Sequence, residues 1–194
     1  MYTKLKSYIE NNLSHQRFEH LLSTAKECAY ICSMFGLDDN AGRVAGIAHD
    51  IARELPPEEI VRLAAEDGFG ISTYEQEHPV LLHGRAGAVI LESEFGLGNE
   101  AILQAVRWHT SGHPDMGEIG KALFVADYIE PGRDHVTDAY RKKIHSLGLN
   151  DMVIEVLSSQ IEYLRNKGNV IVESSFLLYD KLLSEGDRKR VVAG

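Results

Sequence analysis

Cysteine, positive charge and long apolar runs are all scarce in this sequence of 194 residues, and each shortage excludes a class of protein. The only two cysteines, Cys28 and Cys32, lie four residues apart in a helical pattern. We expect two buried thiols, because the pair offers neither a disulfide framework nor a metal signature. No segment contains the roughly 18 apolar residues of a membrane-spanning helix. The N-terminal segment alternates apolar and polar side chains and lacks the apolar centre of a signal peptide, so we expect a cytoplasmic protein.

Basic residues are outnumbered, since 20 Lys and Arg stand against 29 Asp and Glu, and the formal net charge is -9. This balance argues against binding to nucleic acid, which requires clustered Lys and Arg on one face. It does not exclude a small anionic substrate, because bound metal ions supply positive charge within an acidic protein. We therefore expect no nucleic acid and no membrane as partners, while a small anionic molecule remains possible as the substrate.

Signals of β-structure are also missing, since no hairpin turn and no alternation of strands with helices is present. Apolar residues recur instead at helical spacing, which predicts an all-α bundle. Ser14 and Asn99 are suitable N-caps, and glycine and proline mark several helix ends. The expected helices cover residues 2–13, 15–35, 39–52, 57–67, 80–95, 100–109, 119–129, 136–147, 151–166 and 170–183.

Six ionisable side chains interrupt apolar helical segments or lie at a helix end. They are His20, His49, Asp50, His83, His109 and Asp127. Buried charge is unfavourable unless it is paired or bound to metal. Taken singly, each residue is explained equally well as a core side chain with an ordinary hydrogen bond. Taken together, they favour one central site into which neighbouring helices project their ligands.

The adjacent residues His49 and Asp50 indicate how such a site is organised. On a helix of 3.6 residues per turn their side chains diverge by roughly 100°, so one binds a first metal while Asp50 bridges two. Imidazole and carboxylate ligands without thiolate suit Fe, Mn, Co, Ni or Zn. Two such ions lower the pKa of a bridging water and neutralise phosphate oxygens, which predicts hydrolysis of a phosphate ester or anhydride.

Four local motifs carry a resemblance to the HD-domain superfamily, in its dinuclear branch. They are Ala48-His49-Asp50-Ile51-Ala52-Arg53-Glu54-Leu55-Pro56, His83-Gly84-Arg85-Ala86-Gly87-Ala88, Trp108-His109-Thr110-Ser111-Gly112 and Val125-Ala126-Asp127-Tyr128-Ile129-Glu130-Pro131-Gly132-Arg133. The sequence resembles the bacterial YqeK-type symmetrical diadenosine tetraphosphate hydrolases over approximately residues 17–183. The resemblance implies an HD-domain helical bundle. We expect a single domain over residues 1–194, with a metal-binding core at about 17–133 and C-terminal helices at about 134–184.

The resemblance also implies an activity, a metal and a set of ligands. The activity is hydrolysis of diadenosine tetraphosphate to two ADP by metal-activated water, with cleavage at the middle of the bridge and iron as the metal. The first metal would be held by His20, His49, Asp50 and Asp127, and the second by Asp50, His83 and His109.

Further residues are expected to act on the substrate. Asp50 and Arg53 are the expected catalytic residues, and Arg133, Thr110 and Arg53 the expected substrate contacts. Arg53 stands where the family commonly has Lys, and a guanidinium grips phosphate as a fork rather than as a point charge. A solvated side chain remains the alternative for Arg133, and a helix end for Thr110. His78 and His113 are interpreted as exposed or capping residues outside the site.

Two other functions stay open. One is hydrolysis of another nucleotide, such as a nucleoside monophosphate, a deoxynucleoside triphosphate or a guanosine alarmone, because one fold supports several such reactions. The other is a nucleotide-binding module without turnover, for which Arg53 is the only support. A homodimer is also left open, since the sequence does not determine the oligomeric state.

Overall fold

The structure, a computed structural model, describes the backbone of residues 1–192 and the side chains of residues 1–185. Every regular element in this range is helical, which confirms the predicted all-α fold. The α-helices are α1 (Tyr2–Asn12), α2 (His15–Met34), α3 (Asp39–Ala48), α4 (Pro57–Ala64), α5 (Thr73–Glu77), α6 (His83–Ser93), α7 (Glu100–Trp108), α8 (Glu118–Ile129), α9 (Asp138–His145), α10 (Leu149–Asn166) and α11 (Glu173–Val192). Two short 3-10 helices, η1 (Ala65–Asp67) and η2 (Pro79–Leu82), lie in the connections.

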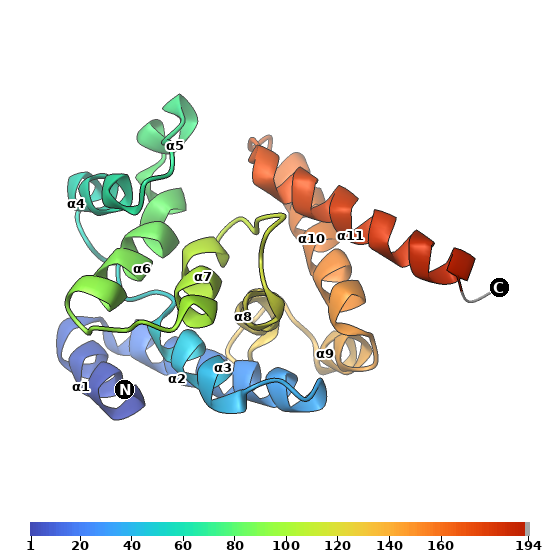
Figure 1. The fold of residues 1–194 in the computed structure, drawn as a ribbon, viewed down its shortest axis with the longest axis horizontal. Helices are drawn as coiled ribbons and strands as arrows, with labels where there is room; N and C mark the ends of the chain where they lie inside the picture. Colours follow the sequence, from blue (N-terminus) through green and yellow to red (C-terminus); the bar gives the residue numbers. More distant parts are fainter. Residues whose placement is uncertain (193–194) are drawn as a thin grey trace.

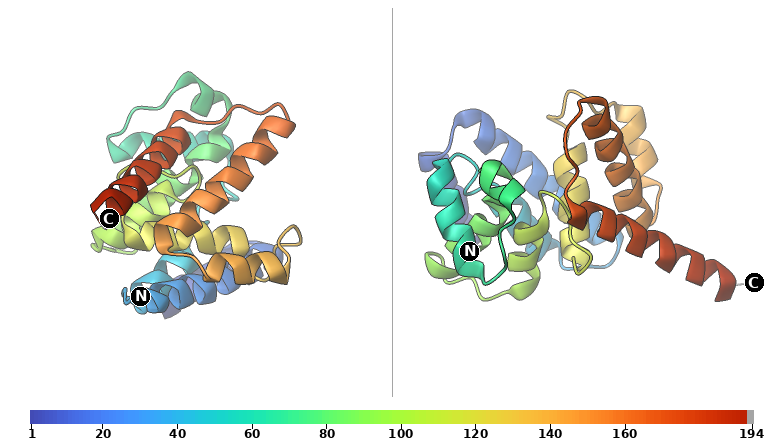
Figure 2. Two further views of the ribbon diagram at one scale, coloured as in Figure 1. Left: turned by 90° about the vertical axis from the view of Figure 1, so that its right-hand side faces the viewer. Right: turned by 90° about the horizontal axis from the view of Figure 1, so that it is seen from above.

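Helix α8 occupies the centre of the bundle, where it packs against α2, α3 and α7 on one side and α10 on the other (Figures 1 and 2). Its side chains are buried around most of its circumference, including Leu123, Phe124 and Val125. A helix that is apolar all round is stable only inside the protein. Asp127, in the last turn of this helix, is thereby carried into the interior.

Helices α2 and α3 pack closely along their lengths because Gly46 has no side chain. A Cβ atom at Gly46 would lie 2.5 Å from the Cα of Ala25, a distance that real contacts do not reach. The close approach brings the end of α3 onto the middle of α2. His49 and His20 are therefore held against one another by backbone packing.

The predicted local signals are confirmed at several helix ends. The Ser14 hydroxyl accepts a hydrogen bond from the Arg17 backbone N–H at 3.3 Å, and Asn99 caps α7 in the same way. Gly36 follows α2 with a positive φ of 67°, a conformation that favours glycine. Cys28 and Cys32 are both buried free thiols, as expected.

The expected extension of the third helix through residue 52 is wrong, because α3 ends at Ala48. Beyond Ala48 the chain forms turns in which a backbone N–H donates to the carbonyl three residues earlier. The Ile51 N–H donates to the carbonyl of Ala48 at 3.0 Å, and the Arg53 N–H to that of Asp50 at 2.9 Å. Asp50 thus lies in a turn at the end of the helix rather than within it.

Two other expected helices begin later than the sequence suggests. The helix expected from residue 80 starts at His83, and Pro79 opens the short 3-10 helix η2 instead. The helix expected from residue 170 starts at Glu173, because the β-branched residues 170–172 disfavour helix and form the connection from α10. Helix α5, with its Ser72–Glu75 capping box, was not among the expected helices. Among the described residues, no helix combines the length and apolar character needed to cross a bilayer.

Candidate metal centre

Five helices and their ends bring the six predicted ligand residues together. His20 comes from the middle of α2, and Asp127 from the last turn of α8. The other four lie at helix ends: His49 follows α3, Asp50 follows His49, His83 begins α6 and His109 follows α7. Their donor atoms fall into three overlapping groups, each compact enough to hold a metal ion. Residues up to 107 positions apart in the chain therefore form one cluster.

The first part of the cluster surrounds one oxygen of Asp50. The Nε2 atoms of His20 and His49 are 3.2 Å apart, and they lie 3.1 and 3.6 Å from Oδ1 of Asp127. Oδ2 of Asp50 lies 3.6 Å from Nε2 of His49 and 3.9 Å from that of His20. Two donors bound to one cation at about 2.1 Å are separated by about 3.0–3.5 Å. The spacing in this part is close to that range.

The second part surrounds the other oxygen of Asp50. Oδ1 lies 2.8 Å from Nε2 of His83 and 3.5 Å from Nε2 of His109. The two imidazole nitrogens are 3.0 Å apart. Because its two oxygens face different sets of donors, Asp50 has the geometry of a bridge between two positions.

The remaining nitrogen of each histidine is already engaged, which fixes the ring. Nδ1 of His49 donates to the carbonyl of Gly46 at 2.9 Å, and Nδ1 of His109 donates to that of Val106 at 2.8 Å. The carbonyl of Val80 accepts from His83 at 2.5 Å, and a carboxylate oxygen of Glu130 accepts from His20 at 3.2 Å. Carbonyl and carboxylate oxygens only accept, so Nδ1 carries the hydrogen and Nε2 offers a lone pair.

Lone pairs therefore face one another at the centre of the cluster. The facing Nε2 atoms of His83 and His109, with Oδ1 of Asp50 beside them, repel unless positive charge lies between them. A single proton joins only two atoms, whereas a divalent cation binds all three. The donor set thus fits a metal ion, and imidazole with carboxylate suits first-row divalent metals.

Gly84 explains why the second part of the cluster is so tight. A Cβ atom there would lie 2.7 Å from the carbonyl oxygen of Val106 and 3.0 Å from Nδ1 of His109. Glycine allows the start of α6 to lie directly against the end of α7. His83, a proposed ligand, is therefore followed directly by the glycine whose close packing positions it.

The surroundings of the two carboxylates in the cluster lower their pKa values. Burial raises the pKa of Asp50, but the imidazoles of His49, His109 and His83 outweigh burial and hold that pKa well below its usual value. Burial likewise raises the pKa of Asp127, and the adjacent imidazoles of His20 and His49, together with the positive charge of Arg133, bring it well below its usual value. Both carboxylates are therefore ionised at neutral pH.

Two residues that the sequence analysis did not assign complete the cluster. Arg17 Nη1 donates to Oδ2 of Asp50 at 2.5 Å. Glu130, only 2% exposed, accepts from His20 and also from the backbone N–H of Gly132 at 2.6 Å. Glu130 lies within the motif 125–133, so an acid at the end of an apolar helix was the available signal. Arg17 lies on an amphipathic helix where nothing distinguishes it from a solvated side chain.

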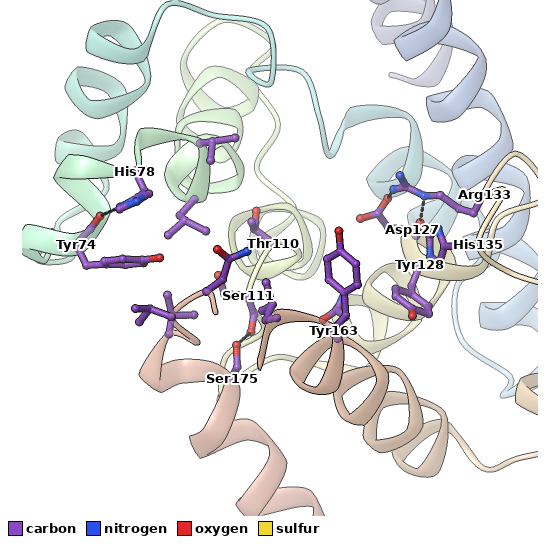
Figure 3. A pocket seen from close by; sticks show the side chains of 17 residues that line it. Tyr74, His78, Thr110, Ser111, Asp127, Tyr128, Arg133, His135, Tyr163 and Ser175 are labelled. Carbon is purple, nitrogen blue, oxygen red and sulfur yellow. Dashed lines mark hydrogen bonds and ion pairs between the residues drawn. The ribbon is translucent and has the colours of Figure 1, made fainter. Parts of the chain in front are cut away.

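A cavity of about 710 Å³ opens beside the cluster and reaches Asp127 (Figure 3). Two of the three expected substrate contacts, Arg133 and Thr110, line it. Arg133 donates from Nε to the backbone carbonyl of Asp127 at 2.8 Å and also pairs with its carboxylate, so it is not a freely solvated side chain. The Thr110 hydroxyl is buried without a hydrogen-bond partner among the described residues.

Arg53 and the two unassigned histidines lie differently. Arg53 is half-buried in the turn after Asp50, does not line the cavity, and makes no side-chain hydrogen bond within the described part of the chain. His78 is exposed and caps α5, as interpreted, yet it also lines the cavity. His113 stacks on Trp108 outside the cavity.

Comparison with known proteins places the chain in a family. The HD domain family matches residues 17–132. The symmetrical bis(5'-nucleosyl)-tetraphosphatase of Bacillus subtilis (strain 168) is 30% identical over 91% of this chain and 94% of its own length. The protein of the same name from Halalkalibacterium halodurans is 30% identical over 94% of this chain and 97% of its own.

A solved structure agrees with this assignment. It is described as a predicted HD superfamily hydrolase involved in NAD metabolism from Clostridium acetobutylicum, and it is 28% identical to this chain. It matches with a TM-score of 0.88 over 95% of this chain and 98% of its own. The HD domain match covers more than half of the chain and includes all six clustered residues. This protein therefore belongs to the HD-domain family, and within it to the group that contains the symmetrical bis(5'-nucleosyl)-tetraphosphatases.

Proposed function

We propose that this protein hydrolyses diadenosine tetraphosphate to two ADP with the help of two divalent cations. One observation carries the proposal: Asp50 turns its two oxygens toward two separate sets of imidazole donors beside an open cavity. Two-metal sites of this kind are typical of phosphate hydrolysis. The relatives named symmetrical bis(5'-nucleosyl)-tetraphosphatase support the choice of substrate.

The donors divide between the two cations through Asp50. The first cation would be held by His20, His49, Asp50 and Asp127, and the second by Asp50, His83 and His109. We propose iron for both positions, while Mn, Co, Ni and Zn suit the same ligands. When bound, such cations lower the pKa of water and neutralise phosphate oxygens.

The side chains around the cluster hold the phosphate groups in place. Arg133 lies at the cavity wall beside Asp127, where its free N–H groups donate to a phosphate oxygen. The Thr110 hydroxyl, which lacks a protein partner among the described residues, donates to a second oxygen. Arg53, in the turn after the bridging residue, lies outside the cavity wall, and its expected contact with the leaving ADP stays a prediction. Arg133 and Thr110 place the middle of the tetraphosphate at the cluster, where water adds and the bridging P–O bond breaks.

Product identification tests the proposal. The purified protein is incubated with diadenosine tetraphosphate and Fe²⁺ or Mn²⁺, and the nucleotides are separated by chromatography. We expect ADP as the main product, formed in a ratio of two to one substrate consumed. ATP with AMP would overturn symmetrical cleavage. Faster turnover of a nucleoside monophosphate, a deoxynucleoside triphosphate or a guanosine alarmone would overturn the substrate, and binding without product would favour a non-catalytic module.

A further inference from the structure

The cavity beside the metal centre is larger than the phosphate groups alone require, and its walls come from distant parts of the chain. One wall is formed by α5 and η2, and the facing wall by the end of α10 and the connection to α11 (Figures 1 and 3). The Ser175 hydroxyl donates to the carbonyl of Ser111 at 2.7 Å, which ties the start of α11 to the loop after α7. The cavity is therefore a built space between fixed elements.

One aromatic pair lies on the α5 wall. The rings of Tyr74 and His78 stack with centroids 4.2 Å apart and planes 28° apart. Nδ1 of His78 donates to the carbonyl of Tyr74 at 2.9 Å, which holds the imidazole over the phenol. The capping box between Ser72 and Glu75 fixes the helix that carries them. Both rings line the cavity.

A second aromatic pair lines the cavity on the side of Asp127. The rings of Tyr128 and His135 meet edge to face, with centroids 5.0 Å apart. Arg133 lies between them in sequence and beside them in the cavity wall (Figure 3). Aromatic rings that remain accessible in a cavity are suited to flat, apolar ligand groups.

The two pairs are linked through the chain to different halves of the metal centre. Only the four residues of η2 separate His78 from His83, whereas Tyr128 directly follows Asp127. His83 belongs to the donors around one oxygen of Asp50, and Asp127 to those around the other. Because the two pairs lie on opposite sides of one cavity (Figure 3), a ligand with an aromatic group at each end would reach both pairs.

We propose that these two pairs are the platforms on which the two nucleobases of the dinucleotide stack. This inference rests on the proposed function, because it assigns the ends of the substrate whose centre lies at the cluster. Stacking of bases on aromatic side chains tolerates any base and contributes substantially to nucleotide affinity. Platforms on opposite sides of the cavity that reaches Asp127 also favour cleavage at the middle of the phosphate bridge.

Binding of ADP and of pyrophosphate to the full chain loaded with Mn²⁺ tests the platforms by calorimetry. We expect two ADP per chain. His78→Ala and His135→Ala, both at exposed side chains, should each weaken one of the two ADP sites about tenfold while pyrophosphate affinity stays unchanged. Tyr74→Leu should repeat the effect of His78→Ala. The matched control is His113→Ala, which removes an equally tight stack on Trp108 outside the cavity, with centroids 4.3 Å apart.

The results separate this inference from the proposed function. A single ADP per chain, equal losses for ADP and pyrophosphate, or an equal loss in His113→Ala would each overturn the platforms. Turnover of diadenosine tetraphosphate by the wild-type protein is measured alongside. If no ADP is released but the platform variants lose ADP selectively, the platforms stand and the proposed function fails. If ADP is released but the variants bind ADP normally, the function stands and the platforms fail.

Discussion

Helix α6 carries a different polar cluster on each of two opposite faces, because His83 and Arg85 are two residues apart and diverge by about 200°. The cluster around Arg85 is closed, which means that its donors and acceptors are paired with one another. Its guanidinium donates to both oxygens of Asp67 at 2.7 Å and to the carbonyls of Gly70, Phe69 and Ala64. Each positive nitrogen therefore meets an acceptor from the protein, and the connection after α4 is held in place.

The cluster around His83 is open, which means that it contains more hydrogen-bond acceptors than donors. Four imidazoles direct lone pairs at one another and at two ionised carboxylates, with Arg17 and Arg133 at the margin. Both clusters are buried, so burial alone does not distinguish them. The balance of donors and acceptors does: a closed set stabilises the fold, whereas a surplus of acceptors calls for cations.

The largest expected effect comes from changing the bridge of the open cluster. Asp50→Asn keeps the shape but removes the charge, so turnover of diadenosine tetraphosphate should fall by at least about 10²–10³-fold. Stabilisation of the protein by added Mn²⁺ in thermal unfolding should also be lost. Asp67→Asn, in the closed cluster, is the control and should keep both properties in the folded protein. Equal turnover in Asp50→Asn and the wild type would show that the charge of Asp50 is not needed for hydrolysis.

The closed cluster predicts the opposite pattern. Arg85→Met leaves Asp67 buried without its partner, so the free energy of unfolding should drop by about 3–5 kcal/mol in urea titrations. Turnover should persist at temperatures where the variant is folded. Arg62→Met removes an exposed arginine paired with Glu59 and Glu66 and should change stability little. If both variants unfold at the same urea concentration, the closed cluster is not structural.

Glu130 lies at the edge of the open cluster, where it orients His20 but is not among the proposed metal ligands. Glu130→Ala should weaken metal binding by about 10–100-fold in a metal titration. The control is Glu27→Ala, which breaks a second buried Glu–His contact, to His145 at 2.6 Å, away from the donors. Metal affinity that falls equally in both variants would assign Glu130 a purely structural role.

The smallest effect is expected at Thr110, whose buried hydroxyl has no hydrogen-bond partner in the described residues. Thr110→Val should raise KM about tenfold, the value of one hydrogen bond to a charged group, without lowering stability. Thr24 has a buried hydroxyl in the same condition on α2, outside the cavity wall. Thr24→Val should leave KM unchanged. An unchanged KM in Thr110→Val would remove this residue from the substrate site.

The sequence was sufficient to predict the open cluster because its members are ionisable residues within apolar segments. His49 and Asp127 interrupt apolar helices, and such residues are rare unless they have a function. The family resemblance drawn from the motifs around them is confirmed. The roles of Arg53, Thr110 and Arg133 remain predictions.

Other parts of the site could not be predicted because they depend on tertiary packing. The cavity unites Tyr74 on α5 with Tyr163 on α10, which are distant in sequence and carry no local signal. Helix α5 itself has five residues, too few for apolar periodicity, although Ser72 and Glu75 show the pattern of a capping box. The early end of α3 reflects the turn that presents Asp50, which propensity does not encode.

Three histidines of the open cluster donate to the carbonyl three residues before them, and this recurring bond ties the proposed metal centre to the folding of helix ends. Gly46 and Val106 lie in the last turns of α3 and α7, where carbonyls lack an N–H partner from the next turn. Each imidazole supplies that partner. Substitution of His49 or His109 would therefore remove a proposed metal donor and, at the same time, a hydrogen bond that closes a helix end.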